Sequence, residues 1–381
     1  MDGVKRLKIA VNTRLLLKNK LEGIGWFTYE SFKRIVKNHP GHKFYFLFDR
    51  RWDDDFIFAD NVTPVLVPPQ ARHPFLFYLW FEKSLPRVLN KIKPDIFISP
   101  DAFNSLSSKF KNLLIVHDLN FEYHPDILPW MVRKYYLHYT PLFVKKADRI
   151  ATVSEYSKQD IVKLYDIAPG NIDVVYNGAN ENFRPLGEEE KHRVRAKYSG
   201  GENYFVFIGA FNRRKNLGNL LKAFDIYKSD TGDDTKLLLV GSKMFSNDEI
   251  KQMYENTRYK NDVIFTGRLE PGELYKVLGA ALALTYVSLF EGFGIPIVEA
   301  FYAEVPVITS NTTSMPEVAG DAALLVNPND VRQIASAMKK IARDSSLRKQ
   351  LVQRGKERRS YFSWDKTAER LWRAIEKTVF D

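Results

Sequence analysis

Apolar runs of strand length alternate with longer amphipathic segments along the whole chain. The runs are rich in Leu, Ile, Val and Phe with little polar alternation, which is typical of strands buried on both faces in a parallel sheet. This rhythm predicts an α/β protein whose strands are joined by helices. The expected strands are 7–12, 44–48, 65–67, 94–99, 113–116, one within 147–157, and 173–175, and then 204–208, 237–240, 263–265, 280–287, 305–308 and 323–326.

Helical periodicity and helix start signals place helices between most of these strands. The segment 74–89 is aromatic on most faces. We expect a core helix there, and the alternative is a patch that docks on a lipid surface. The polar stretch 180–192 contains a run of Glu and is expected to be an interdomain linker. The other expected helices are 26–37, 131–146, a Ser-capped one ending near 164, 217–228, 273–278, 330–343, 346–360 and 364–379.

Composition narrows the class of protein. The 381 residues suffice for two domains of ordinary size. The absence of cysteine excludes a disulfide framework and suits a reducing compartment. No signal peptide is visible, and no apolar run approaches the roughly 20 residues that span a bilayer. We therefore expect a cytoplasmic protein, with peripheral contact at the inner face of the membrane as an alternative.

The net charge of +11 is compatible with three kinds of partner: nucleic acid, an anionic membrane surface, or negatively charged substrates. The basic residues are dispersed and accompany no nucleic-acid motif. A nucleic-acid partner is therefore not expected. A generally basic soluble protein explains the charge equally well.

The stretch 286–307 joins a strand, a glycine turn at 291–294 and the start of a helix. Unpaired backbone N–H groups at such a turn, together with the positive end of the helix dipole, can hold phosphate or sugar oxygens without a metal. Glu291 and Glu299 lie on either side of this turn. The alternative is that the first glutamate belongs to a capping box that starts at Ser288.

The string EGFGIPIVEA at 291–300 closely resembles the Glu–x7–Glu signature of the family-4 retaining glycosyltransferases (glycosyl transferases group 1), which have the GT-B fold. The string ADRIATVSEYS at 147–157 also matches a pattern of this family. The resemblance covers most of the chain and implies two doubly wound, Rossmann-like domains that face a cleft. The implied domains are an acceptor-binding domain, 1–180, completed by the C-terminal helix 364–381, and a nucleotide-sugar-binding domain, 181–363.

The resemblance also implies the donor site. In the family the first glutamate, here Glu291, contacts the donor sugar, and the second holds the ribose hydroxyls. Lys215, at a strand-to-helix turn, is implied to neutralise the donor pyrophosphate. Many members carry an Arg where this chain has Ala210, so Arg213 or Arg214 is expected to replace it. The expected donor-binding residues are Arg214, Lys215, Arg268, Leu269, Glu291, Phe293, Gly294, Ile295 and Glu299.

A second group of candidates belongs to the first domain. His117 and Asp118 follow the strand 113–116, and the carboxyl ends of parallel strands are where such sheets bind ligands. Gly23 and Gly25 are expected to form a loop ahead of a helix, and in the family this loop touches acceptor or donor phosphate. A structural role is the alternative for a lone His. The expected catalytic residues are His117, Lys215 and Glu291.

These features predict a metal-independent, retaining glycosyltransferase that needs no cofactor, since the nucleotide sugar is a substrate. The family implies a glycan or lipid-linked acceptor in bacterial polysaccharide or lipopolysaccharide assembly. GDP-mannose is the first choice of donor and a UDP-sugar the second. The acidic run 53–55 is expected to be a solvated loop rather than a metal site. The alternatives are a catalytically silent nucleotide-sugar-binding protein or a nucleic-acid-binding protein.

Overall fold

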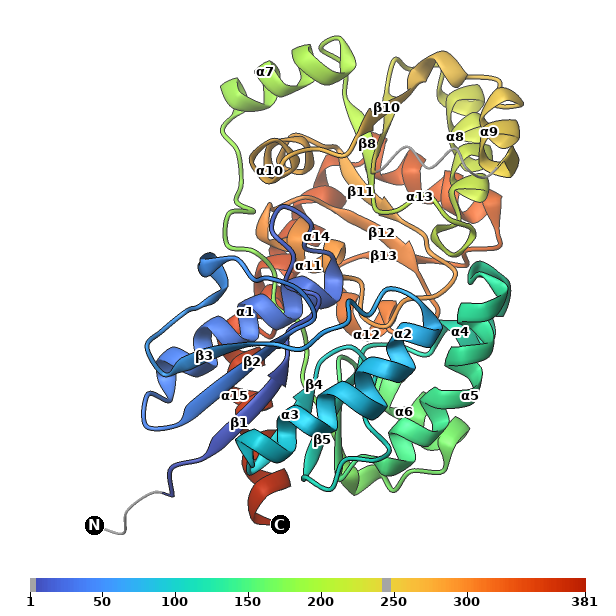
Figure 1. Ribbon diagram of the computed structural model, residues 1–381. Helices are drawn as coiled ribbons and strands as arrows, with labels where there is room; N and C mark the ends of the chain where they lie inside the picture. The colour runs from blue at the N-terminus through green and yellow to red at the C-terminus, as the bar shows by residue number, and fades with distance from the viewer. Residues whose placement is uncertain (1–4, 242–247) are drawn as a thin grey trace. The chain divides into compact units, whose positions relative to one another are not determined.

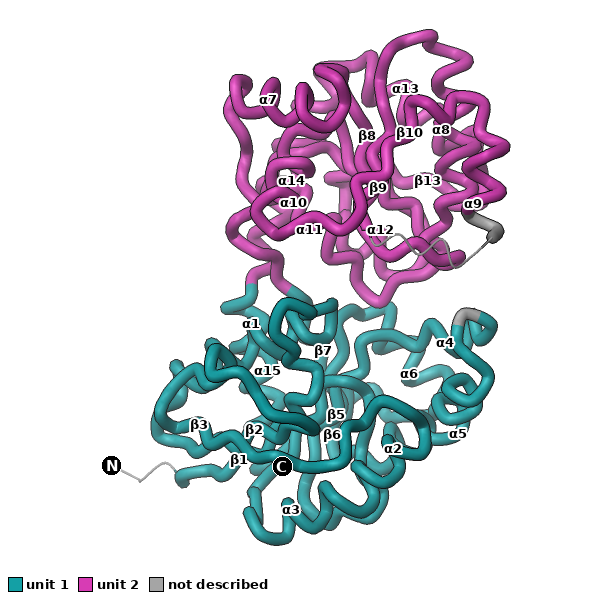
Figure 2. The backbone as a smooth tube through the Cα atoms, turned by 45° about the horizontal axis from the view of Figure 1, so that its top comes forward, with its two compact units in different colours: residues 1–177, 364–381 teal, residues 178–363 magenta. Residues whose placement is uncertain are grey.

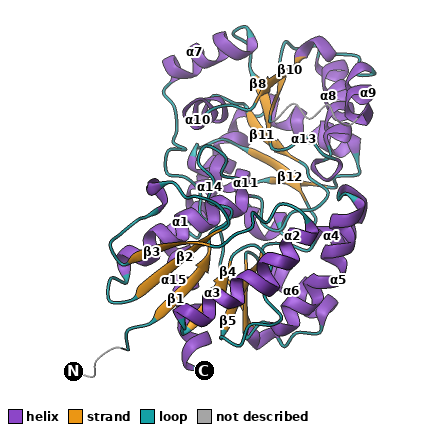
Figure 3. Ribbon diagram, in the orientation of Figure 1, coloured by secondary structure: helices purple, strands orange, loops and turns teal. Residues whose placement is uncertain are grey.

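The computed structural model of the protein describes residues 5–241 and 248–381. Backbone contacts divide the chain into two compact units. Unit 1 comprises residues 1–177 and 364–381, and unit 2 comprises residues 178–363 (Figure 2). Each unit contains one parallel sheet flanked by helices (Figures 1 and 3), which confirms the predicted α/β class with two Rossmann-like domains.

The sheet of unit 1 has seven parallel strands in the order β3-β2-β1-β4-β5-β6-β7. The strand order reverses between β1 and β4, which are hydrogen-bonded neighbours although two strands separate them in sequence. The strands are β1 Lys8–Asn12, β2 Lys43–Phe48, β3 Val62–Leu66, β4 Ile96–Ser99, β5 Asn112–Val116, β6 Arg149–Thr152 and β7 Ile172–Val174.

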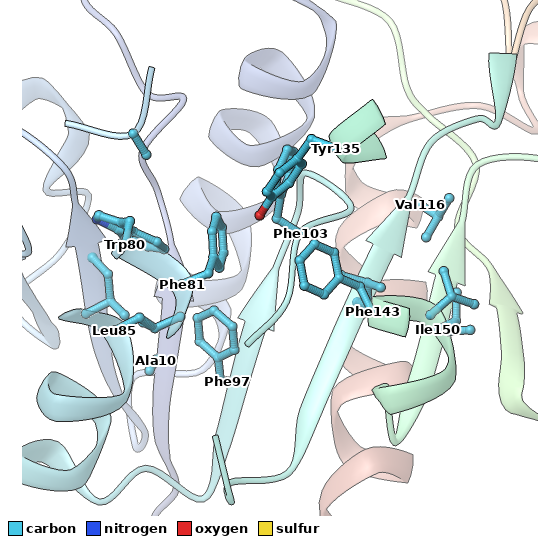
Figure 4. Packing of buried hydrophobic residues seen from close by; sticks show 14 of the residues in the cluster. Ala10, Trp80, Phe81, Leu85, Phe97, Phe103, Val116, Tyr135, Phe143 and Ile150 are labelled. Carbon is cyan, nitrogen blue, oxygen red and sulfur yellow. The ribbon is translucent and has the colours of Figure 1, made fainter. Parts of the chain in front are cut away.

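Helices cover both faces of this sheet, because the strands are apolar on both. On one face a cluster of buried rings, including Phe81, Phe97, Phe103 and Phe143, joins the strands to α2, α3 and α5 (Figure 4). On the other face α1 packs against α15. The helices are α1 Gly23–Asn38, η1 Asp54–Phe56, α2 Pro74–Leu79, η2 Trp80–Ser84, α3 Leu85–Ile92, α4 Asn120–Tyr123, η3 Pro125–Ile127, α5 Trp130–Lys146, α6 Glu155–Tyr165, η4 Pro169–Asn171 and α15 Trp364–Phe380.

The sheet of unit 2 has six parallel strands in the order β10-β9-β8-β11-β12-β13. The strands are β8 Tyr204–Ile208, β9 Lys236–Val240, β10 Val263–Gly267, β11 Ala283–Tyr286, β12 Val307–Ser310 and β13 Leu324–Val326. The helices are α7 Glu188–Ser199, η5 Arg213–Lys215, α8 Leu217–Thr231, α9 Asp248–Glu255, η6 Lys260–Asp262, α10 Pro271–Gly279, α11 Ile295–Tyr302, α12 Met315–Ala319, α13 Val331–Arg343 and α14 Ser345–Arg359.

Two local predictions were wrong. The expected linker 180–192 contains the start of α7, because Glu188–Glu190 favour the positive end of a helix. The expected helix 74–89 is interrupted by a π-helical turn, η2, between α2 and α3. The aromatic rings of the segment 74–89 lie mostly in the core, although Phe75 and Tyr78 are exposed.

No described helix is both long and apolar enough to cross a bilayer.

The C-terminal helix α15 completes unit 1. Its contacts include α1 and strands β4 to β7, and Leu371 and Ile375 have no exposed surface. Trp372 stacks on His39 with a centroid distance of 3.6 Å, and Thr367 donates a hydrogen bond to the carbonyl of Tyr176. The last 18 residues are therefore part of the core of unit 1 rather than a tail.

We expect the Leu371→Ala variant to lower the free energy of unfolding of unit 1 by about 2–5 kcal/mol, because it leaves a cavity under α15. Urea unfolding followed by circular dichroism measures this loss. Arg373→Ala, on the exposed face of the same helix, is the matched control and should change the free energy by less than about 0.5 kcal/mol. Equal effects of the two substitutions would contradict the packing of α15.

Candidate active site

The strand order of unit 2 reverses between β8 and β11, which are paired neighbours. In open parallel sheets such a reversal point opens a crevice at the carboxyl ends of the two strands, where ligands bind. The loop after β8 carries Arg214 and Lys215, and the loop after β11 carries Glu291. The topology therefore brings together three residues that the sequence singled out in separate segments.

The loop after β8 is a short turn held by its own side chains. Asn212 accepts a hydrogen bond from the backbone N–H of Lys215 at 3.2 Å, which caps η5. Asn216 adopts a left-handed conformation with φ of 59°. Its side chain donates to the carbonyls of Val287 at 2.9 Å and Pro328 at 2.7 Å. Asn212 and Asn216 flank Lys215 in the sequence. Their hydrogen bonds therefore hold the backbone of Lys215 beside the end of the neighbouring strand β11.

Glu291 forms ion pairs with two cations. Its Oε1 accepts a hydrogen bond from Lys215 Nζ at 2.6 Å, and its Oε2 accepts one from Arg214 Nη1 at 2.7 Å. Arg214 also donates to the carbonyl of Phe290 at 2.7 Å. The neighbouring Arg213 is exposed. Of the two arginines that the sequence left open, Arg214 is therefore the one that joins the glutamate.

This cluster is buried and carries unequal charge. The side chains of Glu291, Lys215 and Arg214 are 8%, 10% and 16% exposed. Burial alone would raise the pKa of Glu291, but the charges of Lys215 and Arg214 outweigh it and lower the pKa to about 2. The carboxylate is ionised at neutral pH, so two cations face one anion. Two cationic side chains at the carboxyl ends of paired parallel strands are suited to an anionic ligand.

The glycine turn that follows β11 is tied to its neighbours. The carbonyl of Glu291 accepts a hydrogen bond from Ser314 Oγ at 2.8 Å, and its N–H donates to Thr313 Oγ1 at 3.3 Å. Gly294 has φ of 94°, a conformation that other residues rarely adopt, and α11 begins directly after it at Ile295. The capping-box alternative fails because α11 begins at Ile295 with Gly294 as its N-cap, and not directly after Ser288. Pro296 has no N–H group, and the N–H of Ile297 donates to the carbonyl of Gly294 at 3.0 Å.

Glu299, in the second turn of α11, has the opposite environment to Glu291. It is half-buried, and the described part of the chain provides no cation or hydrogen-bond donor for its carboxyl group. Burial raises its pKa to about 8. A half-buried carboxyl group without a protein partner is suited to accept hydrogen bonds from a ligand.

Phe293, Arg268 and Leu269 are further donor-site candidates. Phe293 is buried and packs edge-on against Phe362, with centroids 5.5 Å apart. Arg268 and Leu269 follow β10, the edge strand of the sheet, and Arg268 is exposed. No described hydrogen bond or ion pair links Arg268 to the cluster.

In unit 1, His117 follows β5 as predicted. Its Nε2 lies 2.9 Å from the carbonyl oxygen of Pro100, and its ring packs edge-on against Phe27 with centroids 4.9 Å apart. Burial lowers the pKa of His117 below its ordinary value, so the ring is neutral at pH 7. Asp118 accepts hydrogen bonds from the backbone and side chain of Asn120, at 3.0 and 2.5 Å.

The prediction that Gly23 and Gly25 form a loop was wrong, because α1 begins at Gly23. Both glycines lie in the first helical turn. A Cβ atom at Gly25 would lie 3.0 Å from the carbonyl oxygen of Leu15 and 3.1 Å from Cδ2 of Leu21. Gly25 thus lets the helix approach the preceding loop closely, while Gly23 has open space around it.

Two features of the sites went unrecognised in the sequence. Tyr286, the last residue of β11, contacts Lys215. In unit 1, Arg14 follows β1 and pairs with Asp101 after β4, with 2.6 Å between Nε and Oδ2. Both pairs join neighbouring strands that are distant in sequence. Only the strand order could have revealed them, because the two residues of each pair are 71 and 87 positions apart in the sequence.

No group of three or more His, Cys, Asp or Glu side chains suited to a metal ion occurs among the residues that the structure describes. The acidic run 53–55 pairs with a lysine instead. Lys18 Nζ lies 2.8 Å from Asp53 and 3.3 Å from Asp55.

Comparison with known proteins identifies the family. Residues 188–358 match the family described as Glycosyl transferases group 1, and residues 22–183 match Glycosyltransferase Family 4. The chain is 32% identical over 255 residues to the O-antigen chain mannosyltransferase B of Escherichia coli, and 31% identical over 228 residues to the O-antigen chain mannosyltransferase RfbU of Salmonella typhimurium. These alignments cover 65% and 60% of this chain, and 66% and 60% of the relatives.

Solved structures agree on the fold. A glycosyltransferase from Rickettsia africae has a TM-score of 0.74 at 17% identity, over 99% of this chain and 100% of its own. Anabaena HepE, solved in complex with UDP and glucose, has a TM-score of 0.77 at 15% identity, over 97% of this chain and 100% of its own. The chain belongs to the family-4 (group 1) glycosyltransferases of GT-B fold.

Proposed function

We propose that the protein is a retaining glycosyltransferase that moves a sugar from a nucleotide-sugar donor, bound by unit 2, to a glycan or lipid-linked acceptor, bound by unit 1. The observation that carries this proposal is the position of Lys215 and Arg214 beside Glu291 at the reversal point of the second sheet. Lysine and arginine side chains form charge-assisted hydrogen bonds with phosphate oxygens, so a donor diphosphate would bind there.

Each part of the donor has a candidate partner in unit 2. The diphosphate would bind Lys215 and Arg214, near the positive end of the α11 dipole. The sugar hydroxyls would bind Glu291, and the ribose hydroxyls would bind Glu299. Vicinal hydroxyls make two hydrogen bonds to an ionised carboxylate, so donor binding would shift Glu299 from its protonated to its ionised form.

We propose mannose as the sugar and polysaccharide assembly as the pathway class, because both relatives named above are O-antigen mannosyltransferases. GDP-mannose is the first candidate donor. A UDP-sugar is the second, since a protein of the same fold has been solved with UDP-glucose.

The proposed reaction is a front-face displacement. The bond between the sugar anomeric carbon and the phosphate oxygen breaks as the bond to the acceptor oxygen forms, and the acceptor proton passes to the leaving phosphate. Lys215 and Arg214 stabilise the charge that grows on the diphosphate, and we propose that they make a metal unnecessary. In unit 1, neutral His117 contributes a ring nitrogen and Asp118 a carboxylate to acceptor binding.

We also propose peripheral membrane contact through α5. Its 17 residues contain no Asp or Glu. Lys134 Nζ lies 4.3 Å from the centre of the Trp130 ring. Apolar side chains interleaved with lysines suit the headgroup region of an anionic bilayer. We propose a cytoplasmic location for the protein, because the absence of cysteine suits a reducing compartment. The exposed large apolar residues of α5 are Trp130 (59%), Met131 (43%), Leu137 (39%) and Leu142 (40%), and its exposed lysines are Lys134, Lys145 and Lys146.

The transfer of labelled sugar from GDP-mannose and from UDP-sugars to a membrane extract tests the function. The parent protein should transfer from one donor in excess EDTA. Lys215→Ala should lower kcat by 100-fold or more, on the order of the loss of one preorganised charge-stabilising group. The matched control is Lys222→Ala, an exposed lysine on α8, with unchanged kcat. Donor binding without any transfer would favour the catalytically silent alternative, and loss of activity on chelation would exclude the metal-free mechanism.

Glu299→Gln should weaken donor binding by about 1.5–3 kcal/mol, the value of a hydrogen bond to a charged group. Titration calorimetry with GDP-mannose measures the dissociation constant. An unchanged constant would remove Glu299 from the ribose site.

Although Glu299→Gln should weaken donor binding, we expect it to increase the stability of the protein at high pH. In the parent, the pKa of Glu299 is about 8 when folded and near 4.5 when unfolded. The folded state therefore binds more protons between these values, and its stability falls as the pH rises from about 5 to 8. Glu299→Gln should remove this part of the pH dependence, so that it is more stable than the parent at pH 9. Parallel stability curves for the two proteins would contradict the raised pKa.

The parent should bind vesicles that contain phosphatidylglycerol more tightly than pure phosphatidylcholine vesicles. Replacement of Lys134, Lys145 and Lys146 with Glu should lower this affinity by about 100-fold, because each lysine near such a surface contributes about 1 kcal/mol. A control with Lys37, Lys222 and Lys349 replaced by Glu makes the same change in net charge at exposed positions elsewhere. Equal losses in both triple variants would show that total charge matters and α5 does not.

A further inference from the structure

Tyr286 is the last residue of β11, and its hydroxyl oxygen lies 2.6 Å from Nζ of Lys215. Nζ also lies 4.8 Å from the centre of the Tyr286 ring. We propose that Tyr286 is a positioning residue for the transfer reaction, holding the ammonium group of Lys215 where charge grows on the leaving diphosphate. This inference rests on the proposed function.

The surroundings of Tyr286 show that its hydroxyl group has a specific partner. The residue is 2% exposed. The plane of its ring is inclined by 21° to that of Phe207, with centroids 6.3 Å apart. A Phe side chain would pack equally well against such apolar neighbours. A buried hydroxyl group without a hydrogen-bond partner is destabilising. The contact with Lys215 offsets that penalty.

Lys215 is confined from several directions. Its Cε lies 3.6 Å from the position that a Cβ atom on Gly209 would occupy, so the stem of the lysine runs close over this glycine. Glu291 and Tyr286 then receive two of the three N–H bonds of the ammonium group. The lysine is therefore oriented by two partners of different charge.

The difference in charge between these partners matters for catalysis. Glu291 neutralises one of the two cations, and in the proposed reaction it also binds the sugar. Burial raises the pKa of Tyr286 well above its ordinary value, so the phenol stays neutral. A neutral partner orients Lys215 without cancelling its charge. A second carboxylate in the same place would fix the lysine equally well but would weaken its attraction for the diphosphate.

Tyr286→Phe tests the proposal, because it removes a single oxygen and keeps the ring. We expect kcat to fall by about tenfold, the size of effect expected for one hydrogen bond to a charged group, while KM for the donor changes by less than about twofold. Tyr204→Phe is the matched control. Tyr204 is buried in β8 of the same sheet and donates to the carbonyl of Val277 at 2.6 Å. It should lose comparable stability and keep its kcat.

A double-mutant cycle separates positioning from a general structural role. If Tyr286 acts through Lys215, then adding Tyr286→Phe to the Lys215→Ala variant should cause no further loss of kcat. Additive losses would overturn the inference, as would a Tyr286→Phe variant with the kcat of the parent. A parent protein that transfers from no sugar nucleotide would instead refute the proposed function, so the two failures are distinguishable.

Discussion

The parallel direction of all strands is the constraint on which the rest of the protein depends. Because the carboxyl ends of parallel strands all lie on one side of the sheet, the loops that follow two paired strands lie close together there. Lys215 and Glu291 are 76 residues apart in sequence, yet their charged groups are 2.6 Å apart, since the strands that precede them, β8 and β11, are paired. In unit 1 the pairing of β1 with β4 does the same for Arg14 and Asp101, which are 87 residues apart.

Much of this arrangement could be predicted from local sequence. Buried parallel strands are continuous apolar runs, so strands such as 204–208 were predicted with the correct bounds. The turn after β11 was also predictable, because glycine, proline and glutamate mark it within ten residues. The prediction of a loop at Gly23 and Gly25 was wrong for a physical reason. Glycine is typical both of loops and of close helix packing, and only the nearby Leu15 and Leu21 decide between them.

The chemistry of the site was less predictable, because it depends on neighbours from other strands. Nothing local distinguishes Arg213 from Arg214, and only the short turn η5 determines which of them faces Glu291. The two glutamates of the motif illustrate this further. Two cations hold Glu291 ionised, whereas burial without a partner keeps Glu299 largely protonated at neutral pH. One residue type thus provides an anion and a neutral acid within eight positions.

The return of α15 to unit 1 has a consequence for how the chain folds during synthesis. Unit 2 is one continuous segment, 178–363, whereas unit 1 needs both ends of the chain. At the usual rate of about 5–20 residues per second, the ribosome needs roughly 10–40 s to make the chain between residue 177 and the C-terminus. During this time the sheet of unit 1 lacks α15 on one of its faces, because α15 is made only after all of unit 2. Although its sequence begins first, unit 1 is therefore the last to be completed, and its uncovered apolar face is the surface that chaperones would meet on the nascent protein.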